Sequence, residues 1–293
     1  MRHYRYNIFK GKLQEIESRN RVAKESGSTV VHGITRFADI RINELLSDTV
    51  HHYQHHVERK ASILAGNRNL SRLNPAFASS SQYVNWKGIY TTPVLDQGVC
   101  NCCYAFLVAE QLESDSIRQG ILQTSDWLSV EQILGCSSIA ALCNGNQNNC
   151  PQPSSYTFGC QDSDPYNAIN YVISAGGLQL DSSYPYPSST YGGQSPTSCQ
   201  SNPSAYVTTI SSYTRLLPND EGAMANYLLS TGPFFVLLDA STWDTYTSGV
   251  MGPSDCGKSV THGAQVVGLD LTNGYWIVSL PATPSTLHHY LHI

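Results

Sequence analysis

The chain has 293 residues, a formal net charge of −5 and 41% hydrophobic residues, enough apolar content for a folded core. The acidic balance, without a basic run longer than two residues, argues against nucleic acid or an anionic membrane as a partner. No apolar run approaches the roughly 20 residues that span a bilayer.

Residues 5–20 are predicted to form an amphipathic helix, and residues 41–46 a second, short one. In the first helix, apolar residues recur at helical spacing among Lys and Glu. These apolar residues are Ile8, Phe9, Leu13 and Ile16. The preceding residues contain no apolar segment of a signal peptide, so either the protein is cytosolic or the start of the chain is missing.

Residues 47–80 form a polar stretch that predicts an exposed linker, the kind of place where proteases cut. Asn69 begins an N-glycosylation acceptor pattern, which carries weight only in a secreted protein. Four histidines in the same stretch have the spacing of metal ligands on a helix. A solvated, pH-sensitive segment is the interpretation that we favour for them. The four are His51, His52, His55 and His56.

Residues 97–106 join a polar turn rich in Gly and Cys to an apolar, helix-compatible segment. This places Cys103 at the start of a helix, where unpaired N–H groups and the helix dipole favour a negative charge. A thiol there ionises more easily, and the thiolate is a nucleophile. Gln97 can donate a hydrogen bond to an oxyanion beside the N–H of Cys103. The alternative is a cysteine-rich turn closed by disulfides.

The remaining elements change from helical to strand-rich along the chain. Residues 128–136 predict a capped helix, because Ser129 precedes Gln132 at capping-box spacing. Residues 231–239 and 264–269 are apolar, β-branched and bounded by turn residues, so they predict strands. A helix-rich half is therefore followed by a strand-rich half.

A cysteine nucleophile needs a base that also stabilises its thiolate. Of the ten histidines, His262 is the best candidate because it directly precedes an apolar strand. A histidine in such a place, taken alone, is more often structural. The nine cysteines indicate an oxidising compartment, and their odd number leaves at least one thiol unpaired.

The turn at residues 97–106 resembles that of papain-like cysteine peptidases, Gln-Gly-x-Cys-Gly-Ser-Cys-Trp-Ala-Phe. The chain departs from this pattern at Asn101, Cys102 and Tyr104. The resemblance makes Cys103 the nucleophile rather than Cys102, because the aromatic-Ala-Phe triplet follows it directly. It also makes His262 the proton carrier.

The N-terminal residues resemble the propeptide of cathepsin L-like peptidases. Residues 33–39 are similar to its Gly-x-Asn-x-Phe-x-Asp pattern, with Thr35 in place of Asn, and Lys12 replaces the first Asn of its helix pattern Glu-Arg-Phe-Asn-Ile-Asn. The opening Glu of that pattern would fall at position 1, so we expect the chain to begin inside the propeptide helix. The residues that match the helix pattern are Arg5, Phe9, Ile16 and Asn20.

The resemblance implies an α+β, papain-like two-domain fold, with a helical left domain and a β-barrel-like right domain. A helical propeptide with its linker is expected over residues 1–79, and the peptidase domain over residues 80–293. The sequence diverges after residue 278, where Leu280 stands in place of the family's orienting Asn. We therefore expect a C-terminally incomplete right domain.

The resemblance also implies disulfides and a substrate pocket. The disulfides that the family implies are Cys100–Cys160 and Cys136–Cys199. Proximity in the sequence alone suggests a third disulfide, Cys143–Cys150, and the partner of Cys256 stays open. For each pocket residue, simple packing is the alternative. Asp162 and Ser163 stand in place of the family's Gly-Gly and are expected to narrow the substrate cleft. The apolar set favours Leu, Val or aromatic residues two positions before the scissile bond. This set is Pro165, Leu237, Val260 and Gly263.

The expected function is that of a cysteine endopeptidase zymogen, which needs no cofactor and is lysosomal, vacuolar or extracellular. The propeptide is expected to block the substrate cleft until acid loosens it. Expected partners are peptide or protein substrates, the chain's own propeptide and cystatin-like inhibitors, with a monomeric enzyme. A catalytically inactive homologue that acts by binding is the alternative, because the Asn and the last strands are missing. A metal-binding protein that uses the histidine cluster is a third hypothesis.

Overall fold

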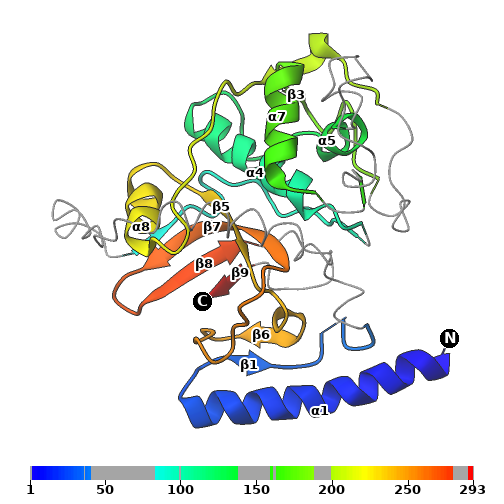
Figure 1. The fold of residues 1–293 in the computed structure, drawn as a ribbon. Coiled ribbons are helices and arrows are strands. Elements are labelled where there is room, and N and C mark those ends of the chain that lie inside the picture. The colour runs from blue at the N-terminus through cyan, green and yellow to red at the C-terminus, as the bar shows by residue number, and fades with distance from the viewer. Residues whose placement is uncertain are drawn as a thin grey trace, which may run out of the picture.

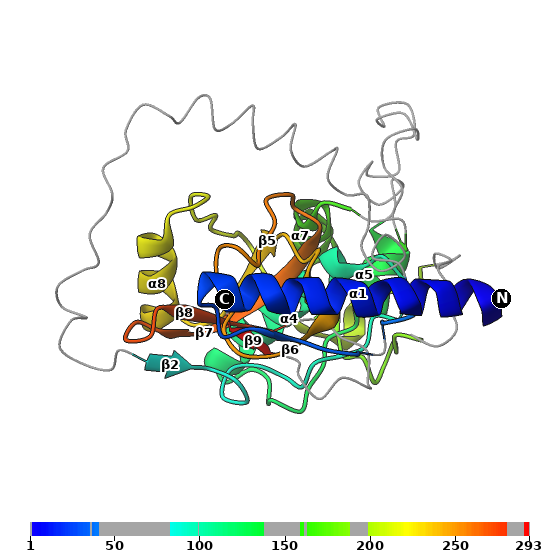
Figure 2. The ribbon, with the colours of Figure 1, turned by 90° about the horizontal axis from the view of Figure 1, so that it is seen from below.

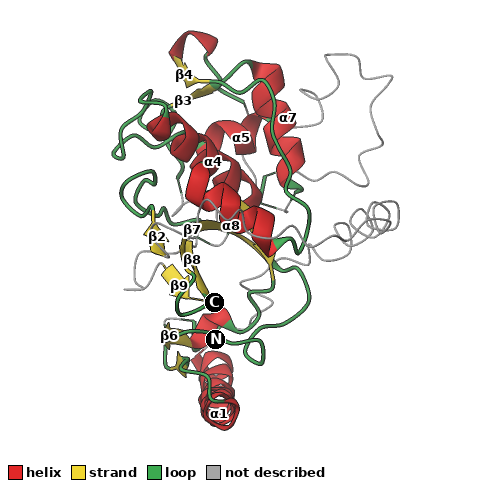
Figure 3. Ribbon diagram, turned by 90° about the vertical axis from the view of Figure 1, so that its left-hand side faces the viewer, coloured by secondary structure: helices red, strands yellow, loops and turns green. Residues whose placement is uncertain are grey.

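The computed structural model describes residues 2–35, 37–40, 83–98, 100–137, 159–160, 163–187, 199–279 and 290–292. Helices α4, α5 and α7 lie at one end of the molecule, a β-sheet lies in the middle, and the N-terminal helix α1 lies at the other end (Figures 1 and 3). Within these ranges, no helix combines the length and apolar character needed to cross a membrane.

The helical layer surrounds α4 (Cys103–Arg118), whose first residues are almost all buried. The Ser129 side chain caps α5 by accepting a hydrogen bond from the Gln132 N–H at 2.9 Å, as the capping-box spacing predicts. The side-chain amide of Gln132 donates to Gly177 O at 3.1 Å and accepts from Gln179 N at 3.0 Å, and so ties α5 to β3. The other elements of this layer are α5 (Val130–Cys136), α7 (Pro165–Ala175), β3 (Leu178–Gln179), η4 (Pro203–Ala205) and β4 (Tyr206–Thr208).

The central sheet is antiparallel, with the order β2-β7-β8-β9 and with β5 beside β2 on the same edge of β7. It stays open within the described residues, and α8 packs against β7. The strands predicted near residues 231–239 and 264–269 are confirmed by β5 and β7. The elements are β2 (Tyr83–Asn85), α8 (Glu221–Ser230), β5 (Phe234–Leu238), β7 (His262–Asp270), β8 (Tyr275–Ser279) and β9 (Tyr290–His292).

The C-terminal residues change one expectation. We expected the sheet to lose its outer strands after residue 278, but β9 pairs with β8 in antiparallel register, Ile277 opposite His292 and Ser279 opposite Tyr290. The edge of β8 is therefore paired by residues of the divergent tail. Backbone hydrogen bonding needs no particular side chain, which is why sequence motifs gave no signal for this strand.

The N-terminal segment forms α1 (Arg2–Ser26) and β1 (Val31–His32). The predicted helix over residues 5–20 is confirmed and extends further at both ends. β1 pairs antiparallel with β6 (Tyr246–Ser248), which follows η5 (Trp243–Thr245), and α1 runs across the face that these elements form (Figure 2). The predicted helix at 41–46, the four histidines of residues 51–56 and Asn69 lie outside the described residues.

Candidate active site

Cys103 is the first residue of α4, as the sequence predicts, and Cys102 occupies the N-cap position. The Cys103 side chain is 9% exposed, whereas Cys102 is fully buried. The first N–H groups of a helix lack intrahelical partners and carry partial positive charge. This position therefore favours a thiolate at Cys103.

Two contacts hold the segment that faces the start of α4. Cys100 and Cys160 form a disulfide with a Cα–Cα distance of 4.6 Å. The Tyr104 hydroxyl donates to Gly159 O at 3.2 Å and accepts from Gly159 N at 3.0 Å. Residues 159–160 are thus attached covalently to the turn before α4 and by hydrogen bonds to α4 itself.

A second disulfide joins the end of α5 to the segment before η4. It links Cys136 to Cys199 with a Cα–Cα distance of 4.7 Å. Both disulfides are pairs that the family resemblance implies. Cys143 and Cys150 lie outside the described residues, as does Asp162.

Strand β7 packs directly along α4. A Cβ on Gly263 would lie 2.2 Å from Leu107 Cδ1, so any other residue there would displace the Leu107 side chain. Two residues further along β7, Gln265 Nε2 donates to Glu110 O at 3.1 Å and to Ser114 Oγ at 2.9 Å. The contacts advance in the same direction along both elements, so the helix and the strand run side by side with their first residues at the same end.

This alignment concerns Cys103 and His262 directly. Cys103 lies one helical turn before Leu107, and His262 directly precedes Gly263 at the start of β7. The elements therefore bring the predicted nucleophile and the predicted base to one end of the helix–strand pair. The arrangement comes from two segments 159 positions apart in the sequence, which only the fold can place together.

His262 keeps part of its surface open to solvent, but its imidazole ring lies among many protein atoms. Desolvation by burial lowers the pKa of His262 from 6.5 to about 4. The ring is therefore neutral near pH 7 in this form of the chain. A neutral imidazole can accept a proton from a thiol, which is the first task of a base in acyl transfer.

Tyr186, which was not singled out from the sequence, links Gln97 to the start of α4. The Tyr186 hydroxyl donates to Gln97 O at 2.7 Å and lies 3.3 Å from Cys102 Sγ. Burial raises the pKa of the Cys102 thiol, so Cys102 stays protonated and is a poor nucleophile. Of the two adjacent cysteines, Cys103 is the less buried, and it is the one that begins α4.

The four predicted pocket residues lie on two layers. Leu237 on β5 pairs in register with Gly263 on β7, and Leu237 Cδ2 lies 3.3 Å from the position of a Cβ at Gly263. Val260 is half-buried just before β7, and Pro165 is buried in the first turn of α7. The structure thus places Leu237 and Gly263 together beside Leu107, one turn along α4 from Cys103.

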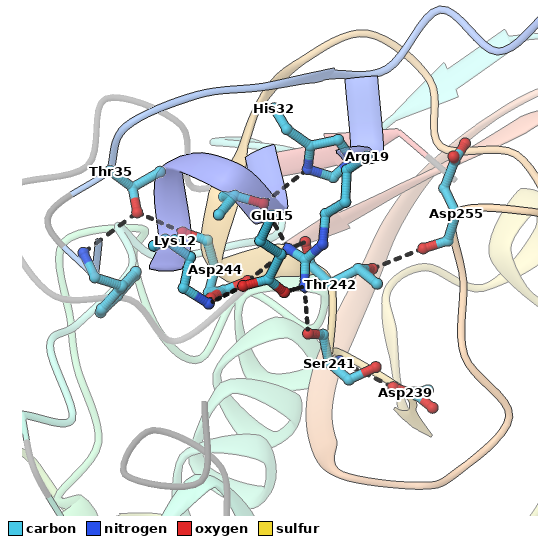
Figure 4. Close-up of polar contacts among 12 residues, drawn as sticks. Lys12, Glu15, Arg19, His32, Thr35, Asp239, Ser241, Thr242, Asp244 and Asp255 are labelled. Atoms are coloured by element: carbon cyan, nitrogen blue, oxygen red, sulfur yellow. Dashed lines mark hydrogen bonds and ion pairs between the residues drawn. The ribbon is translucent and has the colours of Figure 1, made fainter. Parts of the chain in front are cut away.

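The N-terminal segment docks on the segment that contains η5 through a buried ion-pair network (Figure 4). Lys12 Nζ lies 2.6 Å from Asp244 Oδ2 and 2.7 Å from Glu15 Oε2, and Arg19 Nη1 lies 2.9 Å from Asp244 Oδ1. Lys12 and Asp244 have only 7% and 2% of their side chains exposed. Burial alone would lower the pKa of Lys12, but hydrogen bonds and charges from Asp244 and Glu15 outweigh it and raise that pKa.

Backbone contacts extend the same interface along β1 and β6. Asn20 holds the backbone of His32 by two hydrogen bonds of 2.8 Å each. Gly249 has a φ of 89°, and a Cβ there would lie 2.0 Å from Thr29 O, so the two segments approach too closely for any other residue. Thr35 donates to the Asp244 carbonyl. Asn20 and Thr35 belong to the two N-terminal patterns, and the structure shows what each holds.

No group of three or more His, Cys, Asp or Glu side chains is arranged to hold a metal in the part of the chain that the structure describes. The four imidazoles of residues 51–56 and Leu280 lie outside that part. The metal hypothesis therefore has no candidate site among the described residues.

Comparisons with known proteins cover nearly the whole chain. Residues 80–279 match the family described as papain family cysteine protease, and residues 1–45 match the cathepsin propeptide inhibitor domain. Cysteine proteinase 1 of Dictyostelium discoideum is 31% identical over 94% of this chain and 76% of its own length. Cathepsin L of Sarcophaga peregrina is 26% identical over 94% of this chain and 76% of its own length.

Solved structures give the same fold. Digestive procathepsin L 3 from the larval midgut of Tenebrio molitor matches with a TM-score of 0.69 at 23% identity, over 99% of this chain and 85% of that structure's chain. The neighbour confirms the papain-like arrangement of mixed helices and sheet, without a closed barrel among the described residues.

Proposed function

The chain belongs to the papain family of cysteine proteases, and from this premise we propose that Cys103, His262 and Gln97 form the active site of a cysteine endopeptidase zymogen. The observation that carries the proposal is the packing of Gly263 on Leu107, which aligns the start of β7 with the start of α4. Residues 1–79 act as propeptide and linker, and residues 80–293 as the peptidase domain.

The chemistry follows from the position of each group. The Cys103 sulfur attacks the carbonyl carbon of the scissile bond, and its proton passes to His262. The carbonyl electron pair moves to the oxygen, which the Gln97 amide and the Cys103 N–H stabilise. Collapse expels the amine, which takes the proton from His262, and water then hydrolyses the thioester. No cofactor enters any step.

The substrate side of the site is apolar. Leu237 and Gly263, paired across β5 and β7, would contact the residue two before the scissile bond, together with Val260 and Pro165. These four residues carry no charge, and such a lining favours Leu, Val or an aromatic side chain. Peptide and protein chains are the substrates that the family match implies.

The N-terminal segment acts as the inhibitor of its own peptidase domain. Its buried Lys12–Asp244 ion pair and the β1–β6 pairing support tight docking on the segment that contains η5 and β6. The two disulfides support an oxidising location, extracellular or lysosomal and vacuolar. Cystatin-like inhibitors are further expected partners, and the enzyme is expected to be a monomer.

The test is peptide hydrolysis by the full 293-residue chain after processing at acid pH. Cys103→Ala is expected to abolish turnover of a fluorogenic peptide with Leu two before the scissile bond. Cys256→Ser is the matched control, because Cys256 is a half-buried cysteine outside both disulfides that packs against the apolar cluster containing Trp243 and Met251. Turnover that persists in Cys103→Ala would refute the assignment.

A further inference from the structure

Tyr186 occupies a place between the two segments that supply the proposed oxyanion donors. Gln97 belongs to the loop before α4, and the Cys103 N–H belongs to the first turn of α4. The Tyr186 hydroxyl lies 2.7 Å from Gln97 O and 3.3 Å from Cys102 Sγ. One side chain therefore touches both the residue that carries the oxyanion amide and the residue that precedes the nucleophile.

The direction of these hydrogen bonds follows from the donor inventory. A carbonyl oxygen only accepts, so the single hydroxyl proton of Tyr186 goes to Gln97 O. The Cys102 thiol must then donate to the Tyr186 oxygen. A buried thiol that stays protonated fits this role, and burial does raise the pKa of Cys102. The second, non-catalytic thiol is thus a hydrogen-bond donor in an ordered chain from Cys102 through Tyr186 to Gln97.

The ring of Tyr186 is itself held in place. It packs edge-on against Phe106 of α4, with 5.1 Å between ring centroids and an interplanar angle of 88°. Its backbone N–H donates to Asp181 Oδ1 at 2.9 Å. Phe106 is fully buried one turn after Cys103, so the hydroxyl has a fixed position relative to the start of α4.

Gln97 needs such a support. Its Oε1 atom is buried without a hydrogen-bond partner in the described part of the chain. Its side chain is therefore not anchored through that atom, and the carbonyl contact with Tyr186 restrains its backbone. Misplacement of a donor by about 1 Å is enough to weaken transition-state stabilisation.

We propose that Tyr186 is a positioning residue that sets the distance between the Gln97 amide and the Cys103 N–H. This inference rests on the proposed function, because it assigns Tyr186 to the same oxyanion site. It predicts a defect specific to reactions in which the carbonyl oxygen becomes an oxyanion or its analogue.

The test compares two reactions of the same thiol in Tyr186→Phe. A peptide aldehyde forms a hemithioacetal: the Cys103 sulfur bonds the carbonyl carbon, the C=O π bond breaks, and the oxygen takes the thiol proton in the oxyanion site. Iodoacetamide alkylates the sulfur with loss of iodide and forms no oxyanion. In Tyr186→Phe we expect roughly 10-fold weaker aldehyde binding and roughly 10-fold lower kcat, with an unchanged KM and an unchanged alkylation rate. These losses are smaller than the loss expected from deleting a direct oxyanion donor.

Tyr171→Phe is the matched control, because the Tyr171 hydroxyl bonds Gln132 Nε2 at 3.1 Å, within the helical layer and away from the catalytic turn. It is expected to leave the ratio of aldehyde affinity to alkylation rate unchanged. An equal loss of both reactions in Tyr186→Phe would mean a purely structural role and would overturn the inference, as would no loss of either.

A second variant covers a failure of Tyr186→Phe to fold. Cys102→Ala removes the thiol that donates to the Tyr186 hydroxyl and is expected to shift the same ratio about threefold in the same direction. An unchanged ratio would overturn the inference. If wild-type Cys103 reacts with neither reagent after processing, it is the proposed function that fails, and the two failures are thereby distinguished.

Discussion

Asp244→Asn removes the carboxylate that Lys12 and Arg19 share at the buried interface of the N-terminal segment. Asp244 accepts from Lys12 Nζ at 2.6 Å and from Arg19 Nη1 at 2.9 Å, and its side chain is 2% exposed. Breaking a buried ion pair on one side costs about 3–5 kcal/mol, since the remaining charge stays buried. Glu15 still contacts both cations, so we expect the lower end, about 3 kcal/mol.

A loss of about 3 kcal/mol corresponds to docking that is roughly 150-fold weaker. Hydrogen exchange of α1 and β1 amides measures this opening directly, and a Cys103→Ala background prevents self-processing. Asp239→Asn is the matched control: it removes the same charge from the same segment, but Asp239 accepts from Ser241 N and Ser259 N within the peptidase part. Asp244→Asn should speed exchange about 150-fold, and Asp239→Asn should not.

Equal exchange in the two variants would refute this account of the interface. Lys12→Met provides a check from the other side, because it removes one cation and leaves Arg19 beside Asp244. Its effect is expected to be non-additive with that of Asp244→Asn, as for any two groups in direct contact. Strictly additive effects would mean that Lys12 and Asp244 stabilise docking through separate contacts.

Three further predictions concern pH and backbone fit, all in the Cys103→Ala background with urea unfolding as the measurement unless stated. Burial raises the pKa of Glu113 from 4.5 to about 7. Between these pH values the native state binds more protons than the unfolded state, so the protein loses stability as pH rises from 4.5 to about 7. Glu113→Gln should therefore be more stable than its parent above pH 7, by up to about 3 kcal/mol, and equal to it below pH 4.5; a constant difference at all pH values would contradict this. Desolvation lowers the pKa of His262 from 6.5 to about 4, so the unfolded state binds more protons between these values and stability falls as pH falls, by up to about 3 kcal/mol. His262→Asn should lack that loss, and an unchanged pH slope would show that the imidazole is not desolvated. Gly249→Ala should speed hydrogen exchange in β1 at least about 10-fold, because its Cβ would strike the backbone of the N-terminal segment at a φ of 89°. Gly27→Ala is the control, because its φ of 76° brings the same backbone strain but open space surrounds it. Similar exchange in the two variants would count against a close approach at Gly249.

Local sequence signals predicted the elements well because they depend on neighbouring residues. The start of α4 at Cys103 follows from a polar turn before an apolar helix, and the cap at Ser129 follows from its spacing to Gln132. The family resemblance supplied the pairing of Cys100 with Cys160, which no local pattern could establish.

Contacts between distant segments were beyond the sequence. Nothing near Asp244 predicts a buried partner for Lys12, and the departure of Lys12 from the propeptide pattern was the one signal available. Tyr186 was not singled out from the sequence, because the contact of its hydroxyl with Gln97 depends on the packing of its ring against Phe106. Strand β9 was missed for a similar reason, since its pairing rests on backbone groups.

Mass-spectrometric mapping of a peptidyl epoxysuccinyl adduct on the acid-processed wild-type chain tests the central claim most directly. The reagent carries Leu for the apolar pocket and bonds covalently to a reactive thiolate. The account predicts one adduct, on Cys103, which is lost when the acid-processed chain is first denatured. An adduct on the buried neighbour Cys102, or equal labelling of native and denatured chain, would contradict the assignment of Cys103 as the nucleophile.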